Sequence, residues 1–160
     1  MHNIFDAATI SIIVRLFIAL FLGMLIGTER VWAHKTAGMR TYALVSMGAA
    51  LFIIISEMIS VRYLNIGGFD PTRIASQIIV GIGFLGAGSI MLQGSRLRGL
   101  TTASGLWITA GIGMAAGFGF FSLAIIATIL ILFVFIVLWF LEEQLKKTRY
   151  FKESITEELN

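Results

Sequence analysis

The chain has no cysteine, only two histidines and a single proline among its 160 residues. The lack of cysteine excludes disulfides, thiolate nucleophiles and cysteine-ligated metals, and His2 and His34 leave little for a histidine-ligated metal. No nucleophile, base and orienting group occur together, because His34 lies in a loop among cations and the serines have no recognisable partner. We therefore predict no catalytic residues, no metal site and no cofactor, and we expect a protein that is not an enzyme.

Charged residues are also scarce. They make up 13% of the chain, whereas 58% is hydrophobic and the mean hydropathy is +0.92, more than a soluble core needs. The sequence therefore predicts an integral membrane protein with the lipid bilayer as its surroundings. The net charge of +3 resides mostly in short loops between apolar runs, which indicates membrane topology and gives no case for nucleic acid as a partner.

Apolar runs long enough to cross a bilayer follow one another along the chain. We predict an all-α integral membrane protein, a compact bundle of five transmembrane helices at about residues 9–27, 41–59, 73–92, 101–117 and 120–141. The fifth has a simple lipid-facing composition. The fourth is short and glycine-rich, so that it could tilt, break or re-enter. Residues 1–141 would form the transmembrane domain, and residues 142–160 a short cytoplasmic tail with helical spacing.

The distribution of positive charge predicts the orientation. With the N-terminus outside and the C-terminus cytoplasmic, the inner side receives nine lysines and arginines, and the outer side receives only Arg62 and Arg73. Short loops rich in Lys and Arg stay on the cytoplasmic side. The sequence therefore favours an orientation with the N-terminus outside and the C-terminus inside.

Polar residues on the outer side suggest an ion-pair cluster. Arg15 lies too deep in the first segment to ignore, and an intramembrane charge needs a partner. Glu57 and Asp70 are its candidate partners, with Gln77 as a hydrogen-bonding neighbour, and Asp70 could also pair with Arg73. Asp70 also suits the N-cap of the third helix. We favour a structural cluster over a transported-ion site.

The inner side carries a second, basic cluster. Glu29 and Arg30 end the first segment, Arg40 and Thr41 open the second, and they face Arg96, Arg98, Thr101 and Thr102. Such a cluster could bind an anionic head group, a phosphate or an acidic partner. The alternative, that these cations only fix the topology, has an equal claim.

Glycines recur at the spacing of close helix contacts. Gly23/Gly27 and Gly113/Gly117 form GxxxG pairs, which let backbones approach each other. The run from Gly81 to Gly86 also matches GxGxxG, but it lies inside an apolar segment, which rules out a dinucleotide site. Internal packing is favoured over a dimer seam, and a homo-oligomer is left open. The glycines expected at helix contacts are Gly23, Gly27, Gly81, Gly83, Gly86, Gly88, Gly113 and Gly117.

Several of these motifs together resemble the membrane domain of the MgtC/SapB family. They are Ile26-Gly27-Thr28-Glu29-Arg30, Ala37-Gly38-Met39-Arg40-Thr41, Asp70-Pro71-Thr72-Arg73, the glycine run from Gly81 to Gly88, and Gly99-Leu100-Thr101-Thr102-Ala103 with Trp107. The match covers residues 15–119 in order. The resemblance implies a multi-pass protein of the bacterial cytoplasmic (inner) membrane that is linked to growth at low magnesium and, in some pathogens, to virulence. Many family members carry a soluble ACT-like C-terminal domain, which we do not expect in this chain.

The resemblance and the residue analysis lead to one set of candidate site residues and two functions. The leading hypothesis is a non-enzymatic protein that modulates another membrane protein or system under magnesium stress. The alternative is a small transporter or channel for an ion or anionic solute; direct magnesium transport is disfavoured because few carboxylates are available. The candidate site residues are Arg15, Glu29, Arg30, Arg40, Thr41, Asp70, Arg73, Gln77, Thr101, Thr102 and Trp107.

Overall fold

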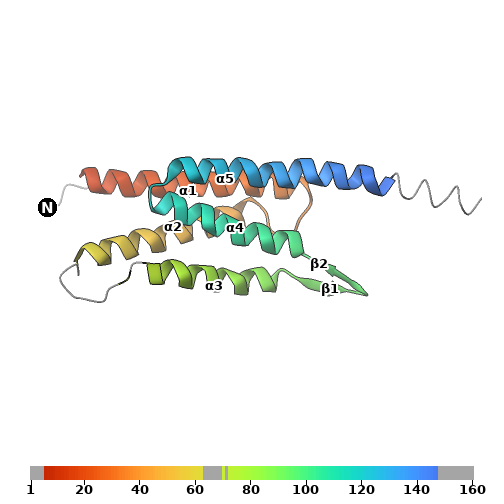
Figure 1. Ribbon diagram of the computed structural model, residues 1–160, viewed down its shortest axis with the longest axis horizontal. Helices are drawn as coiled ribbons and strands as arrows, with labels where there is room; N and C mark the ends of the chain where they lie inside the picture. The colour runs from red at the N-terminus through yellow and green to blue at the C-terminus, as the bar shows by residue number, and fades with distance from the viewer. Residues whose placement is uncertain (1–5, 63–69, 71, 148–160) are drawn as a thin grey trace, which may run out of the picture.

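The fold is known from a computed structural model that describes residues 6–62, 70 and 72–147. Apolar segments form five α-helices in this part of the chain, and the last runs on through a π-helical turn to Lys147 (Figure 1). Asp6 caps the first helix, because its side chain accepts a hydrogen bond from the Ala7 amide at 2.8 Å. The elements are α1 (Ala7–Trp32), α2 (Met39–Arg62), α3 (Thr72–Gly88), α4 (Leu100–Gly117), α5 (Phe121–Phe133) and η1 (Val134–Leu138).

A short β-hairpin joins α3 to α4. The predicted helix over 73–92 is wrong at its end, because α3 stops at Gly88 and residues Met91–Gln93 form strand β1, which pairs with β2 (Arg96–Arg98). The two-residue turn between the strands places Gly94 at a φ of 62°, which glycine adopts without strain. Gly-Ser between two short segments is a recognised hairpin signal that our sequence analysis missed.

Three helices are long and apolar enough to cross a membrane by length and composition. They are Ala7–Trp32, Met39–Arg62 and Phe121–Lys147, the last comprising α5, η1 and the helical residues that follow. At 1.5 Å per residue each exceeds the roughly 30 Å of a hydrocarbon core. The chain is therefore a multi-pass membrane protein, whereas full crossing by α3 and α4 stays a prediction.

Helix α4 lies at the centre of the bundle. It is flanked by α1, α2, α3 and α5 (Figure 1), and most of its residues are buried, including Leu106, Ala110 and Ile112. Helix α3 lies at the edge, where only Ile82 and Gly86 are buried. The fourth predicted segment, which was short and glycine-rich, therefore forms the core of the fold.

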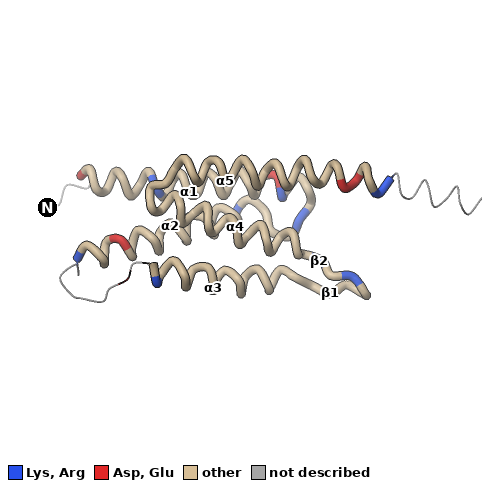
Figure 2. The backbone as a smooth tube through the Cα atoms, in the orientation of Figure 1, with Lys and Arg blue, Asp and Glu red and all other residues tan. Residues whose placement is uncertain are grey.

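The chain reverses direction at two ends of the bundle, which differ in charge (Figure 2). We call one the basic end: it holds the α1–α2 loop with Lys35, the start of α2 with Arg40, and the hairpin with Arg96 and Arg98. We call the other the Arg15 end, where α4 turns into α5. The two candidate polar clusters thus lie far apart.

The α2–α4 contact is a contact between backbones. A Cβ added at Gly113 would lie 2.0 Å from the Ser46 carbonyl oxygen, and one added at Gly117 would lie 2.8 Å from the Ala50 carbonyl oxygen. Neither distance is possible for a real side chain, so both positions require glycine. The GxxxG pair of α4 therefore lies within the bundle.

The α1–α2 contact has the same character. A Cβ at Gly23 would lie 2.5 Å from the Tyr42 carbonyl oxygen, and one at Gly27 would lie 2.5 Å from the Met39 Cα. Because the two helices run antiparallel from the short loop at residues 33–38, these glycines bring the loop-proximal halves together. Helices α1, α2 and α4 form one tightly closed unit.

The glycines of α3 differ from this expectation. An added Cβ at Gly86 would lie 3.6 Å from the Ala103 carbonyl oxygen, which is ordinary contact. At Gly81, Gly83 and Gly88 it would meet nothing within 4 Å, so the packing role predicted for these three is not seen in the described part of the chain. The physical reason is that α3 lies at the edge, with one face against the bundle.

Candidate functional site

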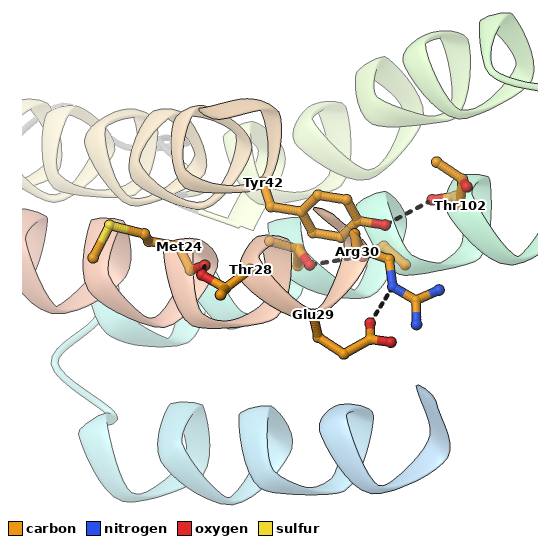
Figure 3. Close-up of polar contacts among 8 residues, drawn as sticks. Met24, Thr28, Glu29, Arg30, Tyr42 and Thr102 are labelled. Atoms are coloured by element: carbon orange, nitrogen blue, oxygen red, sulfur yellow. Dashed lines mark hydrogen bonds and ion pairs between the residues drawn. The ribbon is translucent and has the colours of Figure 1, made fainter. Parts of the chain in front are cut away.

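A buried charge lies near the basic end, at the last turn of α1. Arg30 is only 3% exposed, and its Nε donates a hydrogen bond to the Glu29 carboxylate (Figure 3). Its guanidinium carbon also lies 3.5 Å from the ring centroid of Phe135 in η1. A carboxylate and an aromatic face together stabilise a cation that water cannot reach.

Tyr42 and Thr102 complete the Arg30 cluster from α2 and α4. The Tyr42 hydroxyl donates a hydrogen bond of 3.3 Å to the Thr102 carbonyl oxygen (Figure 3), and both residues are buried. Thr102 lies in the first turn of α4, where its carbonyl is within reach of a side chain from α2. The cluster therefore connects three helices and the π-helical turn.

The π-helical turn positions the aromatic ring. Phe135 is buried although most of its neighbours in η1 are exposed, and an added Cβ at Gly105 would lie 2.7 Å from the Phe135 ring. Gly105 therefore provides the space into which the ring inserts beside Arg30. Single π-turns often occur at functional sites.

Arg15 pairs with Glu57 at the opposite end. The ion pair joins α1 to the last part of α2, and the same Arg15 Nη1 donates a hydrogen bond of 3.1 Å to the Gly117 carbonyl oxygen at the end of α4. The side chains are 21% and 48% exposed. Arg15 thus satisfies one of the free carbonyls that end α4. Of the two partners considered from sequence, the structure selects Glu57.

Asp70 acts on its own helix. Its carboxylate accepts hydrogen bonds from the Thr72 hydroxyl at 2.7 Å and the Thr72 amide at 2.9 Å. The hydroxyl bond, then the amide bond, lowers the pKa of Asp70 below its ordinary value. Pro71 lies outside the described residues. Asp70 is exposed and forms no ion pair with Arg15 or Arg73 in the described part of the chain, so that expectation is corrected to a local cap.

Three further candidates line a groove between α2 and α3. The groove has a volume of about 670 Å³ and is largely apolar, with Arg40 and Thr41 near one end and Gln77 along the α3 wall. Arg73 is exposed in the first turn of α3. Gln77, expected from the sequence to hydrogen-bond near Arg15, lies instead on the surface of the bundle, because α3 is peripheral.

Thr101 and Trp107 lie in a hollow between α4 and α5. The hollow has a volume of about 660 Å³ and contains exposed side chains of α4. Trp107 is 51% exposed, whereas Thr102 is only 3% exposed, so these two candidates lie in different surroundings. The Thr102 carbonyl oxygen accepts the hydrogen bond from Tyr42 of α2, whereas Trp107 lines the hollow between α4 and α5.

Three structurally important residues were missed by sequence analysis. They are Tyr42, Phe135 and Ser46, of which Ser46 is buried between close backbones and its hydroxyl has no hydrogen-bond partner in the described structure. Tyr42 could have been noticed as a hydroxyl at the start of an apolar segment. Nothing in the aliphatic and aromatic run around Phe135 distinguishes it from its neighbours.

The fold and these polar clusters define a multi-pass α-helical membrane protein whose intramembrane charges are paired at the two ends of a closed core. Residues 16–144 match the family model described as MgtC family. The chain belongs to the MgtC family of bacterial membrane proteins, and the family resemblance noted from the sequence is confirmed.

Curated relatives agree with this assignment. Protein MgtC of Salmonella typhimurium (strain LT2) is 52% identical over 120 residues, which is 75% of this chain and 49% of that protein. Protein MgtC of Brucella abortus is 47% identical over 72% of this chain and 46% of that protein. The putative magnesium transporter YhiD of Escherichia coli (strain K12) is 43% identical over 79% of this chain and 60% of that protein.

The matched region is only part of each relative: the chain spans about half the length of the MgtC proteins that it matches. No solved structure matches the chain.

Proposed function

We propose that this protein is a non-enzymatic protein of the bacterial cytoplasmic membrane that modulates another membrane system during adaptation to low magnesium. In a pathogenic bacterium it would also have a role in virulence. The link to magnesium rests on family membership and on the name of the YhiD relative. The observation that carries the choice of modulator over pore is the backbone contact that closes the bundle.

The closed core supports a modulator. At Gly113 and Gly117 the backbone of α4 contacts the backbone of α2, and at Gly23 the backbone of α1 contacts α2. A hydrated ion needs a passage between helices lined by polar groups. Backbone contact across the middle of α2 leaves no such passage between these helices.

The state of the carboxylates points the same way. Magnesium prefers several oxygen ligands in octahedral geometry. Glu29 and Glu57 each pair with an arginine, and they lie at opposite ends of the bundle. An arginine that already neutralises a carboxylate also repels a second cation, so neither acid is suited to hold magnesium on a path through the protein.

The orientation follows from the basic end. Lys35, Arg40, Arg96 and Arg98 all lie there, and positively charged short loops favour the cytoplasmic side. We infer that the basic end is cytoplasmic, the N-terminus outside and the C-terminus inside. In this arrangement α3 and α4 cross beside the three longer helices.

Liposome flux tests the choice between modulator and pore. We expect vesicles containing the purified protein and an enclosed Mg²⁺ indicator to leak no faster than empty vesicles. Protein-dependent Mg²⁺ entry that is lost in Glu57→Gln but kept in Glu142→Gln would overturn the proposal. The two substitutions remove one carboxylate each: Glu57 is paired with Arg15 at one end of the bundle, and Glu142 lies in the helical residues after η1.

Cross-linking in cells tests modulation directly. A photo-cross-linking residue at Gln77 faces the α2–α3 groove, and one at Phe17, which is 66% exposed on α1, serves as the control. We expect a single adduct of defined mass at the Gln77 position, enriched after magnesium limitation, and none at the Phe17 position. Adducts of equal yield at both positions in either medium would contradict a specific partner.

The alternative function is a small transporter for an ion or anionic solute. The printed name of YhiD favours it, as does the excess of positive side chains at the basic end. The same vesicles loaded with phosphate or chloride separate the two functions, because a transporter would move one of these anions at a rate proportional to the amount of protein.

A further inference from the structure

A polar cavity opens at the basic end, between the α1–α2 loop, the end of α3 and the start of α4. Its volume is about 600 Å³, within the range of small-molecule sites. Unlike the two grooves described above, much of its lining is polar. The polar side chains that line it are His34, Lys35, Thr36, Ser89, Gln93, Arg98 and Thr102.

The cavity carries positive charge that is not neutralised locally. Lys35 and Arg98 both line it, and no carboxylate of the described chain does. Glu142 acts electrostatically on Lys35, but its carboxylate bonds to the Lys146 ammonium at 2.8 Å. Two cations converge here from elements that are far apart in the sequence, a loop and a strand.

Backbone donors add to this charge. The first amide of α4 with a helical acceptor is that of Ala103, which bonds to the Gly99 carbonyl oxygen at 2.8 Å. Gly99 caps α4 without any side-chain hydrogen bond and lines the cavity together with Thr102. Free amides at a helix start bind anions well when cations lie beside them.

The turn before α4 is rigidly shaped. Gly99 has a φ of 92°, and an added Cβ would lie 2.0 Å from the Ser89 carbonyl oxygen, so the backbone there is in contact with the end of α3. The same contact brings Ser89 and Arg98 to one wall of the cavity. The cavity therefore belongs to the packed structure of the bundle.

We propose that this cavity binds the phosphate group of a phosphate-bearing small molecule or lipid. A dianionic or diester phosphate matches two convergent cations, and its several oxygens accept from hydroxyls and backbone amides together. Met91 and Leu92 supply an apolar wall, and the volume exceeds that of a lone phosphate, which favours a ligand with a carbon skeleton.

The proposal goes beyond the modulator function and is tested without it. Purified protein in a neutral detergent is titrated with sn-glycerol 3-phosphate in one arm and with short-chain phosphatidylglycerol in the other, and thermal unfolding is followed by tryptophan fluorescence. Glycerol and short-chain phosphatidylcholine are the matched probes without net negative charge. We expect a saturable rise in melting temperature in one arm, which identifies the source of the phosphate.

Variants separate the cavity from general basicity. Lys35→Gln and Arg98→Gln remove one lining cation each, and Arg96→Gln removes a cation two residues away on the same strand that does not line the cavity. Loss of one charged hydrogen bond weakens binding about tenfold. We expect that loss in the first two variants, an unchanged affinity in Arg96→Gln, and recovery of affinity in Lys35→Arg.

Two results would overturn the proposal. One is the absence of saturable stabilisation in both arms, and the other is an equal loss of affinity in Arg96→Gln and Arg98→Gln, which would indicate diffuse attraction. Because Lys35 and Arg98 are exposed side chains, their replacement leaves the core intact, and elution as a single species checks this. Neither result bears on the cross-linking experiment, so the proposed function would stand or fall separately.

Discussion

Replacing Gly113 by alanine tests whether the α2–α4 seam is as close as the structure indicates. The new Cβ would lie 2.0 Å from the Ser46 carbonyl oxygen, whereas ordinary contact begins at 3.4 Å. The two helices must therefore part by about 1.4 Å at this point, or one must rotate. Neither neighbour is the flexible end of a side chain that could move aside, because the atoms in contact are backbone.

The expected cost follows from overpacking. Added methyl groups in a well-packed core typically cost about 1–3 kcal/mol. Alanine also forms helices more readily than glycine, by about 1 kcal/mol, which offsets part of the cost. The difference is a net cost of about 0–2 kcal/mol. We expect Gly113→Ala to lower the free energy of unfolding by about 2 kcal/mol, the upper end of this range, because the contact is with backbone.

Gly111 supplies the matched control on the same helix. A Cβ there would meet nothing within 4 Å, so Gly111→Ala changes helix propensity alone and should leave stability equal or slightly raised. Unfolding in mixed micelles titrated with sodium dodecyl sulfate, followed by far-ultraviolet circular dichroism, gives both free energies. Equal stability of the two variants would refute a backbone seam between α2 and α4.

Further predictions concern single side chains. Ser46→Ala should raise stability by about 1 kcal/mol in the same titration, because it removes a buried hydroxyl without a partner; a loss would mean that the hydroxyl is bonded. Arg15→Gln should cost about 1–2 kcal/mol and Glu57→Gln about 1 kcal/mol, since only the former also loses the Gly117 carbonyl bond; the reverse order would contradict the geometry. Phe135→Leu should cost about 1–2 kcal/mol, because it removes the aromatic face over Arg30; an unchanged free energy of unfolding would contradict that contact. Asp70 has a lowered pKa, so its stabilisation of the α3 start is present above the ordinary carboxyl pKa and is lost as the pH falls through the lowered value; protection of the early α3 amides from hydrogen exchange should follow this pH dependence, and Asp70→Asn, which still caps, should abolish it.

The helices could be predicted from the sequence because hydrophobic runs of sufficient length have few other outcomes in a membrane. Helices α1, α2 and α5 begin and end within a few residues of the expected positions, apart from longer ends at Trp32 and Lys147. The end of α3 was missed because hydropathy does not distinguish Met91 and Leu92 in a strand from the same residues in a helix. The Gly94-Ser95 pair indicated a hairpin turn, but the apolar run up to Leu92 was long enough to be assigned to the helix.

The ion pairs were partly predictable. Glu57 was one of two partners considered for Arg15, because Arg15 and Glu57 were expected on the same side of the membrane. The structure shows this ion pair. Glu29 and Arg30 are sequence neighbours, but adjacent side chains on a helix do not face each other, so their pairing was not predicted. The aromatic partner of Arg30 was not predictable, because Phe135 reaches it through a π-helical turn and a gap left by Gly105, neither of which has a signal in this aliphatic sequence.

The glycines show why motif spacing predicts less than it suggests. A small-residue spacing of four defines a stripe on one helix, but a close contact also needs a partner helix along that stripe. Gly113 and Gly117 meet such a partner in α2, whose carbonyl groups lie against them. Gly81 lies on a helix at the edge of the bundle, where the same residue type meets no atom of the described chain. Whether a glycine makes a close contact therefore depends on which helix packs against it. The spacing of glycines along one helix does not determine that arrangement.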